Sequence, residues 1–98
     1  MTNSFMDTIT EPVFLATLPL ELERTIELLD SHGITFTTGR ASLPDPRSVA
    51  GVREGIVFRV LNRQADFCRE ILAAHGLGRG VLAAGVTVDA TVLELTTR

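Results

Sequence analysis

The sequence predicts an α+β fold, a ferredoxin-like β-α-β-β-α-β sandwich in which two helices cover one face of an antiparallel sheet. Strand-like segments over residues 12–18, 34–38, 56–61 and 86–92 alternate with two segments of helical periodicity. Both helical segments end in His-Gly, within LLDSHGI and ILAAHGL. These similar endings indicate two related halves of one domain.

In the first half, PVFLATL at residues 12–18 is typical of a strand, because proline is tolerated at a strand's first position. Thr17 is expected to cap the helix that follows, since its hydroxyl can accept from a backbone N–H of the first turn. This helix is expected to end at His32-Gly33, where glycine can adopt a positive φ. Residues 34–38, ITFTT, alternate between apolar and polar and predict a second strand.

The second half has a buried strand followed directly by a helix. The apolar run at residues 56–61 is interrupted only by Arg59, as in a strand covered on both faces. Asn62 is a good N-cap for a helix that ends at His75-Gly76. The core is expected to join the helix residues Leu22, Ile26, Leu29, Cys68, Ile71 and Leu72 to the strand residues Val13, Leu15, Ile34, Phe36, Phe58 and Val60.

The segment after the second helix predicts a fourth strand. Val86, Val88, Ala90 and Val92 alternate with polar residues within an extended stretch from 81 to 95. Residues 1–11 are polar and predict a loose N-terminal arm, which leaves residues 12–98 as a single domain.

Composition narrows the class of protein. The net charge is −3, which argues against general nucleic-acid binding, and all nine basic residues are arginine. No apolar run approaches the roughly 18 residues of a membrane span, and the N-terminus lacks a signal-peptide pattern. One cysteine fits a reducing cytoplasm, so we expect a cytoplasmic protein that does not interact with membranes.

The sequence offers little catalytic or metal-binding chemistry. Cys68 and His75 are about 10 Å apart along a helix, too far to share a metal ion or to form a nucleophile–base pair. Cys68 is therefore expected to be a buried structural residue. His32 and His75 are expected to cap the carbonyl ends of their helices, and GLGRG at residues 76–80 predicts a turn. We expect no enzyme activity, no metal site and no cofactor.

The order of elements is combined with a characteristic set of residues in each half. In the first half these are Leu28, Leu29, Gly33 and Ile34, and in the second half they are Val57, Val60, Ala65, Ile71, Leu72 and Gly76. Together they resemble the bacterial family of small putative signal-transducing proteins, a domain of unknown function similar in fold to the PII (GlnB-like) regulators. In PII-like regulators the connection between the second and third strands contacts partner proteins and helps to hold nucleotide, and the resemblance implies such a role for residues 39–55.

Residues 39–55, GRASLPDPRSVAGVREG, predict a long loop with three glycines and two prolines. Loops of this length in small domains are usually functional or mobile. We expect Arg40, Arg47 and Arg53, with Arg79 of the glycine-rich turn, to bind a partner or ligand.

Several functions are compatible with this pattern. The first is a non-enzymatic regulatory module that binds an acidic protein through the 39–55 loop and forms a homodimer through its last strand or its sheet faces. The second is a PII-like sensor of a nucleotide or another small anion. A small enzyme of the ferredoxin-like type has the least support, because no acid–base pair lies at a usable spacing, and a phage or mobile-element inhibitor is a further alternative. A loop with no function beyond connecting two strands also remains open.

Overall fold

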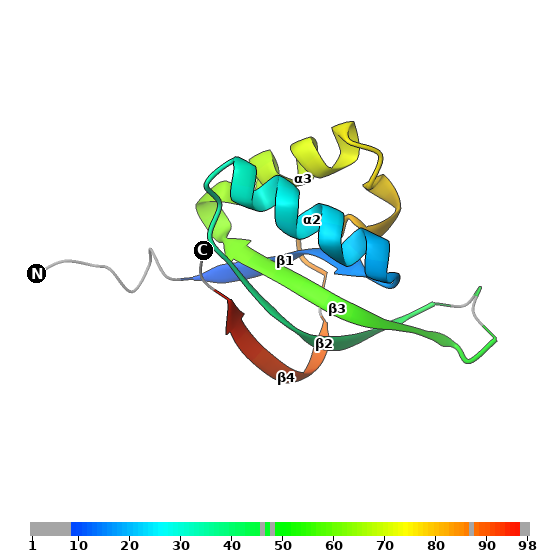
Figure 1. Ribbon diagram of the computed structural model, residues 1–98. Helices are drawn as coiled ribbons and strands as arrows, with labels where there is room; N and C mark the ends of the chain where they lie inside the picture. Colours follow the sequence, from blue (N-terminus) through cyan, green and yellow to red (C-terminus); the bar gives the residue numbers. More distant parts are fainter. Residues whose placement is uncertain (1–8, 46, 48, 87, 97–98) are drawn as a thin grey trace, which may run out of the picture.

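The computed structural model describes residues 9–45, 47, 49–86 and 88–96, and it confirms an α+β fold with two helices on one face of an antiparallel sheet (Figure 1). The elements in chain order are β1 (Thr10–Ala16), α2 (Pro19–Ser31), β2 (Phe36–Pro44), β3 (Val52–Leu61), the 3₁₀ turn η1 (Asn62–Gln64), α3 (Ala65–Ala74), the 3₁₀ turn η2 (Gly78–Gly80) and β4 (Asp89–Thr96).

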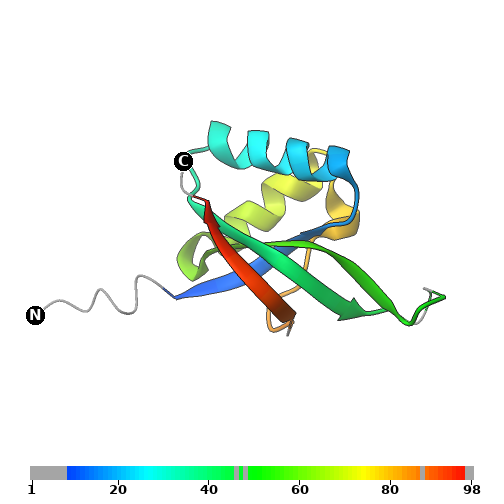
Figure 2. The ribbon, with the colours of Figure 1, turned by 60° about the horizontal axis from the view of Figure 1, so that its bottom comes forward.

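The strands lie in the order β1-β3-β2-β4, and every neighbouring pair is antiparallel. Because β3 lies between β1 and β2, helix α2 connects two strands that are not adjacent. This split β-α-β arrangement of the first three strands is compatible with a ferredoxin-like sandwich. Helices α2 and α3 cover what we call the front face of the sheet, and we call the opposite face the back face (Figures 1 and 2).

Three phenylalanines form the centre of the front-face core. Phe14, Phe36 and Phe58 come from the three neighbouring strands and are buried. The Phe58 ring lies 6.1 Å from that of Phe14 and 5.4 Å from that of Phe36, in edge-on and tilted contacts. Contacts of this kind add about 0.5–1.5 kcal/mol each to the free energy of burial. The helices pack their apolar faces on these rings.

The prediction that Leu15 faces the helices is wrong, because β1 contains a bulge. The register between β1 and β3 shifts between Pro12 and Phe14, so Val13 and Phe14 both join the front-face core. Leu15 instead lies in a second apolar cluster with Val57. A bulge reverses the face to which all later residues of a strand point.

The second cluster lies on the back face and is covered by the chain after η2. We call this segment, with its residues Leu82, Val86 and Val88, the strap. These residues pack against Leu15, Ala41, Leu43 and Val57. The chain thus passes from Val81, which bridges Phe14 beside β1, across the back face to Asp89 beside β2 (Figures 1 and 2). That crossing spans four strand spacings, about 19 Å, within the reach of eight extended residues.

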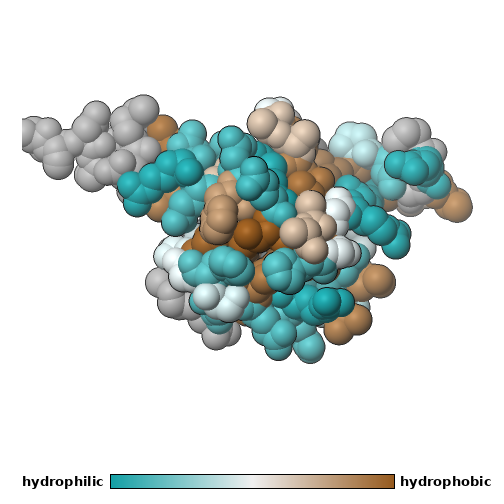
Figure 3. Space-filling model, turned by 90° about the horizontal axis from the view of Figure 1, so that it is seen from above, coloured by the Kyte–Doolittle hydropathy of each residue, from teal (hydrophilic) through white to brown (hydrophobic). Residues whose placement is uncertain are grey.

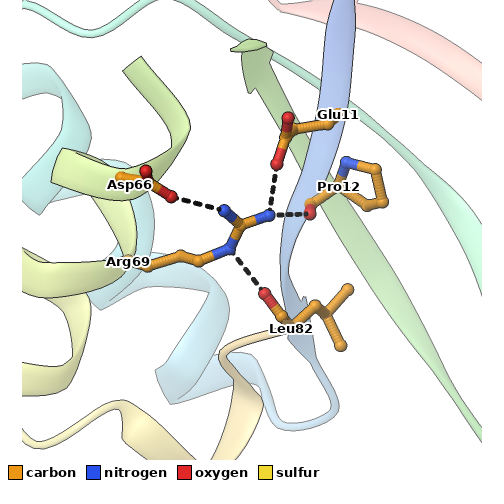
Figure 4. A network of polar contacts seen from close by, with 5 residues as sticks. All are labelled: Glu11, Pro12, Asp66, Arg69 and Leu82. Atoms are coloured by element: carbon orange, nitrogen blue, oxygen red, sulfur yellow. Dashed lines mark hydrogen bonds and ion pairs between the residues drawn. The ribbon is translucent and has the colours of Figure 1, made fainter. Parts of the chain in front are cut away.

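Arg69 of α3 holds the start of the strap against β1 (Figure 4). Its Nε donates to the carbonyl of Leu82 at 2.6 Å, and one Nη donates to both the Glu11 carboxylate and the Pro12 carbonyl. The other Nη donates to Asp66 at 3.1 Å. The guanidinium therefore joins α3, β1 and the strap, and its side chain is only 13% exposed.

Several predicted boundaries are wrong. Residues 10 and 11 of the predicted N-terminal segment belong to β1, and the rest of that segment, except Ile9, lies outside the described residues. Strand β2 begins at Phe36 rather than at residue 34 and continues to Pro44. The expected loop at 39–55 is consequently mostly paired strand, from Gly39 opposite Val57 to Pro44 opposite Val52. Residues 41 and 43 point to the back face and are buried in its apolar cluster, which stabilises the additional residues of β2.

The expected start of each helix is also wrong in detail. Glu21 caps α2, because its Oε1 accepts from the backbone N–H groups of Thr17 and Leu18, at 2.9 and 3.3 Å, and from the Thr17 hydroxyl. Asn62 begins η1, and α3 starts only at Ala65. No helix in the described part of the chain is long and apolar enough to span a membrane.

Replacement of Arg69 by methionine is expected to lower the free energy of unfolding by about 2–4 kcal/mol, because four acceptors lose a charged donor whose side chain is nearly buried. Arg63→Met in the exposed turn η1 removes the same charge and is the matched control. Chemical denaturation followed by circular dichroism measures both variants. Equal losses in the two would contradict a stabilising role specific to Arg69.

Gly80→Ala is expected to lower the free energy of unfolding by about 1–3 kcal/mol, through overpacking. A Cβ at residue 80 would lie 2.6 Å from the carbonyl oxygen of Leu15 and from the Phe14 ring. Gly78 lies in the same turn, but the nearest atom to a Cβ there is 3.9 Å away. Thermal unfolding of both alanine variants gives the comparison, and an equally destabilised Gly78→Ala would show that space is not the cause.

Candidate functional site

The most prominent feature outside the core is the hairpin formed by the ends of β2 and β3, which we call the arm. It comprises the paired residues 39–44 and 52–55 and the described residues of the connection between them. The arm projects past the ends of the helices (Figure 1). Element lengths explain this projection: β3 has 10 residues and α2 has 13, which correspond to about 33 Å of strand and about 20 Å of helix.

The tip of the arm is closed by local hydrogen bonds. The N–H of Asp45 donates to the carbonyl of Gly51 at 3.0 Å, and the Asp45 carboxylate accepts from the N–H of Arg47 at 3.0 Å. Gly51 has a φ of +80°, which an L side chain rarely adopts. Beyond these bonds Val49 is fully exposed.

The two faces of the arm differ. On the back face, Ala41 and Leu43 are buried beneath the strap. On the front face, neither helix covers the strand ends, and a hollow of about 410 Å³ is present. Its lining residues are Arg40, Ala41, Ser42, Glu54, Gly55 and Ile56. The arm therefore has a packed back and an open front that combines a guanidinium, a carboxylate and apolar surface.

The structure distributes the four predicted arginines over different surfaces. Arg40 is exposed at the front-face hollow, and Arg47 is exposed at the tip. Arg53 is half-buried and, by strand alternation, belongs to the back face; its Nε has no hydrogen-bond partner. Arg79 lies in η2, which packs on α3 and on β1, two strands away from β2.

Glu54 is a residue of the hollow that the sequence argument did not single out. Its position directly across from Ser42, on the same face as Arg40, follows from the β2–β3 register. Knowledge of that register would have identified it, but a segment interpreted as a loop has no register. A carboxylate beside Arg40 makes the hollow less favourable for a small anion than arginine alone would.

A second hollow, of about 310 Å³, lies between the helices. Leu28 and Leu77 provide its apolar lining, and Arg24, Glu27, Ser31 and His75 provide polar groups. Seen from the helical side, hydrophobic residues are gathered at the centre of this face within a hydrophilic surround (Figure 3). Arg24 and Glu27 carry opposite charges, so the hollow has no strong charge preference.

Both histidines cap helix ends, as predicted. The Nδ1 of His32 donates to the carbonyl of Leu28 at 3.0 Å, and that of His75 donates to the carbonyl of Ile71 at 2.8 Å. The His32 ring also forms a T-shaped contact with the Phe67 ring, with centroids 5.9 Å apart. Within the described residues, no three His, Cys, Asp or Glu side chains are grouped as a metal site would require.

Cys68 is fully buried in the front-face core, as predicted for a structural cysteine. Burial raises the pKa of its thiol to about 11, although the positive charge of Arg69 opposes part of this increase. A thiol with so high a pKa is a poor nucleophile at neutral pH, because the thiolate is the reactive form.

The free energy of unfolding is expected to fall as the pH rises from 9 to 11, because the thiol ionises near its ordinary pKa of 9.0 in the unfolded chain but near 11 in the folded one. The sequence contains no lysine and no tyrosine, so Cys68 is the only side chain expected to titrate in this interval. Urea denaturation across this pH range should show the decline in the wild type and little or none in Cys68→Ala. Identical pH profiles would contradict the raised pKa.

Comparison with known proteins identifies no relative: no family model, no curated protein and no solved structure matches the chain.

Proposed function

We propose that the chain is a non-enzymatic regulatory module that binds another protein through the front face and the tip of the arm. The observation that carries this proposal is the open front of the arm, where two paired strands extend beyond the helical layer. Loops and hairpins on a rigid scaffold are the usual location of binding residues.

The chemistry of the arm favours a partner with an acidic side chain next to an apolar one. Arg40 at the hollow and Arg47 at the tip are exposed cations that can form two parallel hydrogen bonds with a carboxylate. Val49 and Val52 are exposed apolar residues of the same hairpin. Arginine is enriched among the residues that dominate binding energies, and the two valines add apolar surface that a partner can bury.

The arm is also organised before it binds. Its strands are paired from Gly39 to Pro44, and its back is packed by the strap at Ala41 and Leu43. A preformed hairpin loses less conformational entropy on association than a mobile loop of the same sequence. This feature favours recognition by an ordered surface over capture by a flexible loop.

The proposal includes a ferredoxin-like classification and a PII-like regulatory role. The β1-β3-β2 order with α2 and α3 on one face supports the classification, although β4 lies beside β2. In the PII-like regulators that the sequence resembles, the connection between the second and third strands contacts partner proteins. The arm occupies the same position in the order of elements.

The double substitution Arg40→Glu with Arg47→Glu is expected to weaken capture of the partner at least about tenfold, which corresponds to about 1.4 kcal/mol. The physical reason is that both exposed cations of the arm become repulsive toward an acidic surface. Affinity capture from cells that express the chain, with quantitative mass spectrometry, measures the loss.

Arg24→Glu with Arg63→Glu is the matched control, because it makes the same change of net charge on exposed residues outside the arm. A second variant replaces residues 45–51 with Asn-Gly, a two-residue turn that can join Pro44 to Val52 and retain the ladder. Equal capture by wild type, arm variant and shortened hairpin would refute binding through the arm.

A further inference from the structure

The two edges of the sheet are protected to different extents. On the β1 edge, Pro12 has no N–H to offer, and its carbonyl accepts from Arg69. The carbonyl of Val13 accepts from the N–H of Leu82 at 2.8 Å, and Val81 forms a bridge with Phe14. These contacts occupy the groups to which another strand would otherwise bind.

The β4 edge has none of these contacts in the described part of the chain. Strand β4 pairs with β2 along one side, from Phe36 opposite Thr96 to Ser42 opposite Asp89, with a register shift between Arg40 and Ala41, and is the terminal strand of the sheet. On each side of that shift, every second N–H and C=O of β4 points away from β2, so β4 presents such groups on its other side. The sequence of β4, DATVLELT, contains no proline, a residue that commonly blocks strand edges.

We propose that the β4 edge pairs with the β4 edge of a second copy of this chain, in antiparallel orientation about a two-fold axis. Two identical antiparallel edges are self-complementary, so one contact satisfies both of them and the assembly closes as a dimer. The two four-stranded sheets become one continuous sheet. This proposal is independent of the function assigned to the arm.

The sheet faces offer less room for association, because the helices cover the front and the strap covers part of the back.

Sedimentation equilibrium over a concentration series tests the dimer directly, and a two-fold increase in mass with concentration is expected. Amide hydrogen exchange of the wild type, followed by NMR, adds a residue-level readout. The β4 amides that point away from β2 should become protected as the dimer forms. A chain that stays monomeric at about 1 mM, where even weak dimers form, overturns the proposal.

Two neighbouring proline substitutions, Leu93→Pro and Glu94→Pro, locate the contact. Successive N–H groups of a strand point to opposite sides, so one variant loses a bond to β2 and the other loses only an outward N–H. The variant that loses a bond to β2 should unfold at a lower temperature. The variant that loses only an outward N–H should remain folded and become monomeric. A folded outward variant that is still dimeric, or a wild-type dimer without new β4 protection, places the interface elsewhere and refutes the proposal.

Discussion

The structure depends on one guanidinium group in the seam between α3, β1 and the strap. Arg69 donates to two carbonyls and two carboxylates that come from three separate segments of the chain. Its planar fork can do this because the donors have fixed relative directions, whereas a lysine ammonium is a single point of charge. Arg69 binds the Leu82 carbonyl at the point where the chain leaves β1. Beside β1 the chain forms the Val81 bridge, and β4 pairs at the opposite edge of the sheet.

The path of the strap also explains why the back of the arm is packed. The chain must cross the back face to reach β2, and on its way it buries Ala41 and Leu43. Those residues would otherwise expose an apolar surface on a hairpin that extends past the helices. The same crossing requires little side-chain volume where the chain meets β1, and Gly80 meets this requirement beside Leu15 and Phe14. Packing on the back face thus holds a hairpin whose front face is open.

The periodicity of the sequence was sufficient for the class, the two helices and most of the front-face core, because apolar spacing reports local geometry directly. The same periodicity could not predict the arm. Two prolines and three glycines in residues 39–55 suggested a loop, and the apolar–polar alternation of the two paired segments is weak. The bulge beside Pro12 and the Arg69 contacts could not be predicted from the sequence for a different reason. Arg69 and Glu11 are 58 positions apart, and no local pattern reports a contact over that separation. The sequence predicted Arg40 and Arg47, which lie on the open arm. Glu54 could be placed at the hollow only once the register of β2 and β3 was known.

The position of β4 has a consequence for how the chain is made. Strand β2 is complete at Pro44, but its outer neighbour begins only at Asp89. On a nascent chain, which grows at about 5–20 residues per second, the outer side of β2 therefore waits several seconds for its partner. Contacts between segments so distant in sequence raise the contact order and slow folding. During that interval the incomplete sheet has an unpaired edge and an uncovered back, and such a state is the one most prone to aggregation.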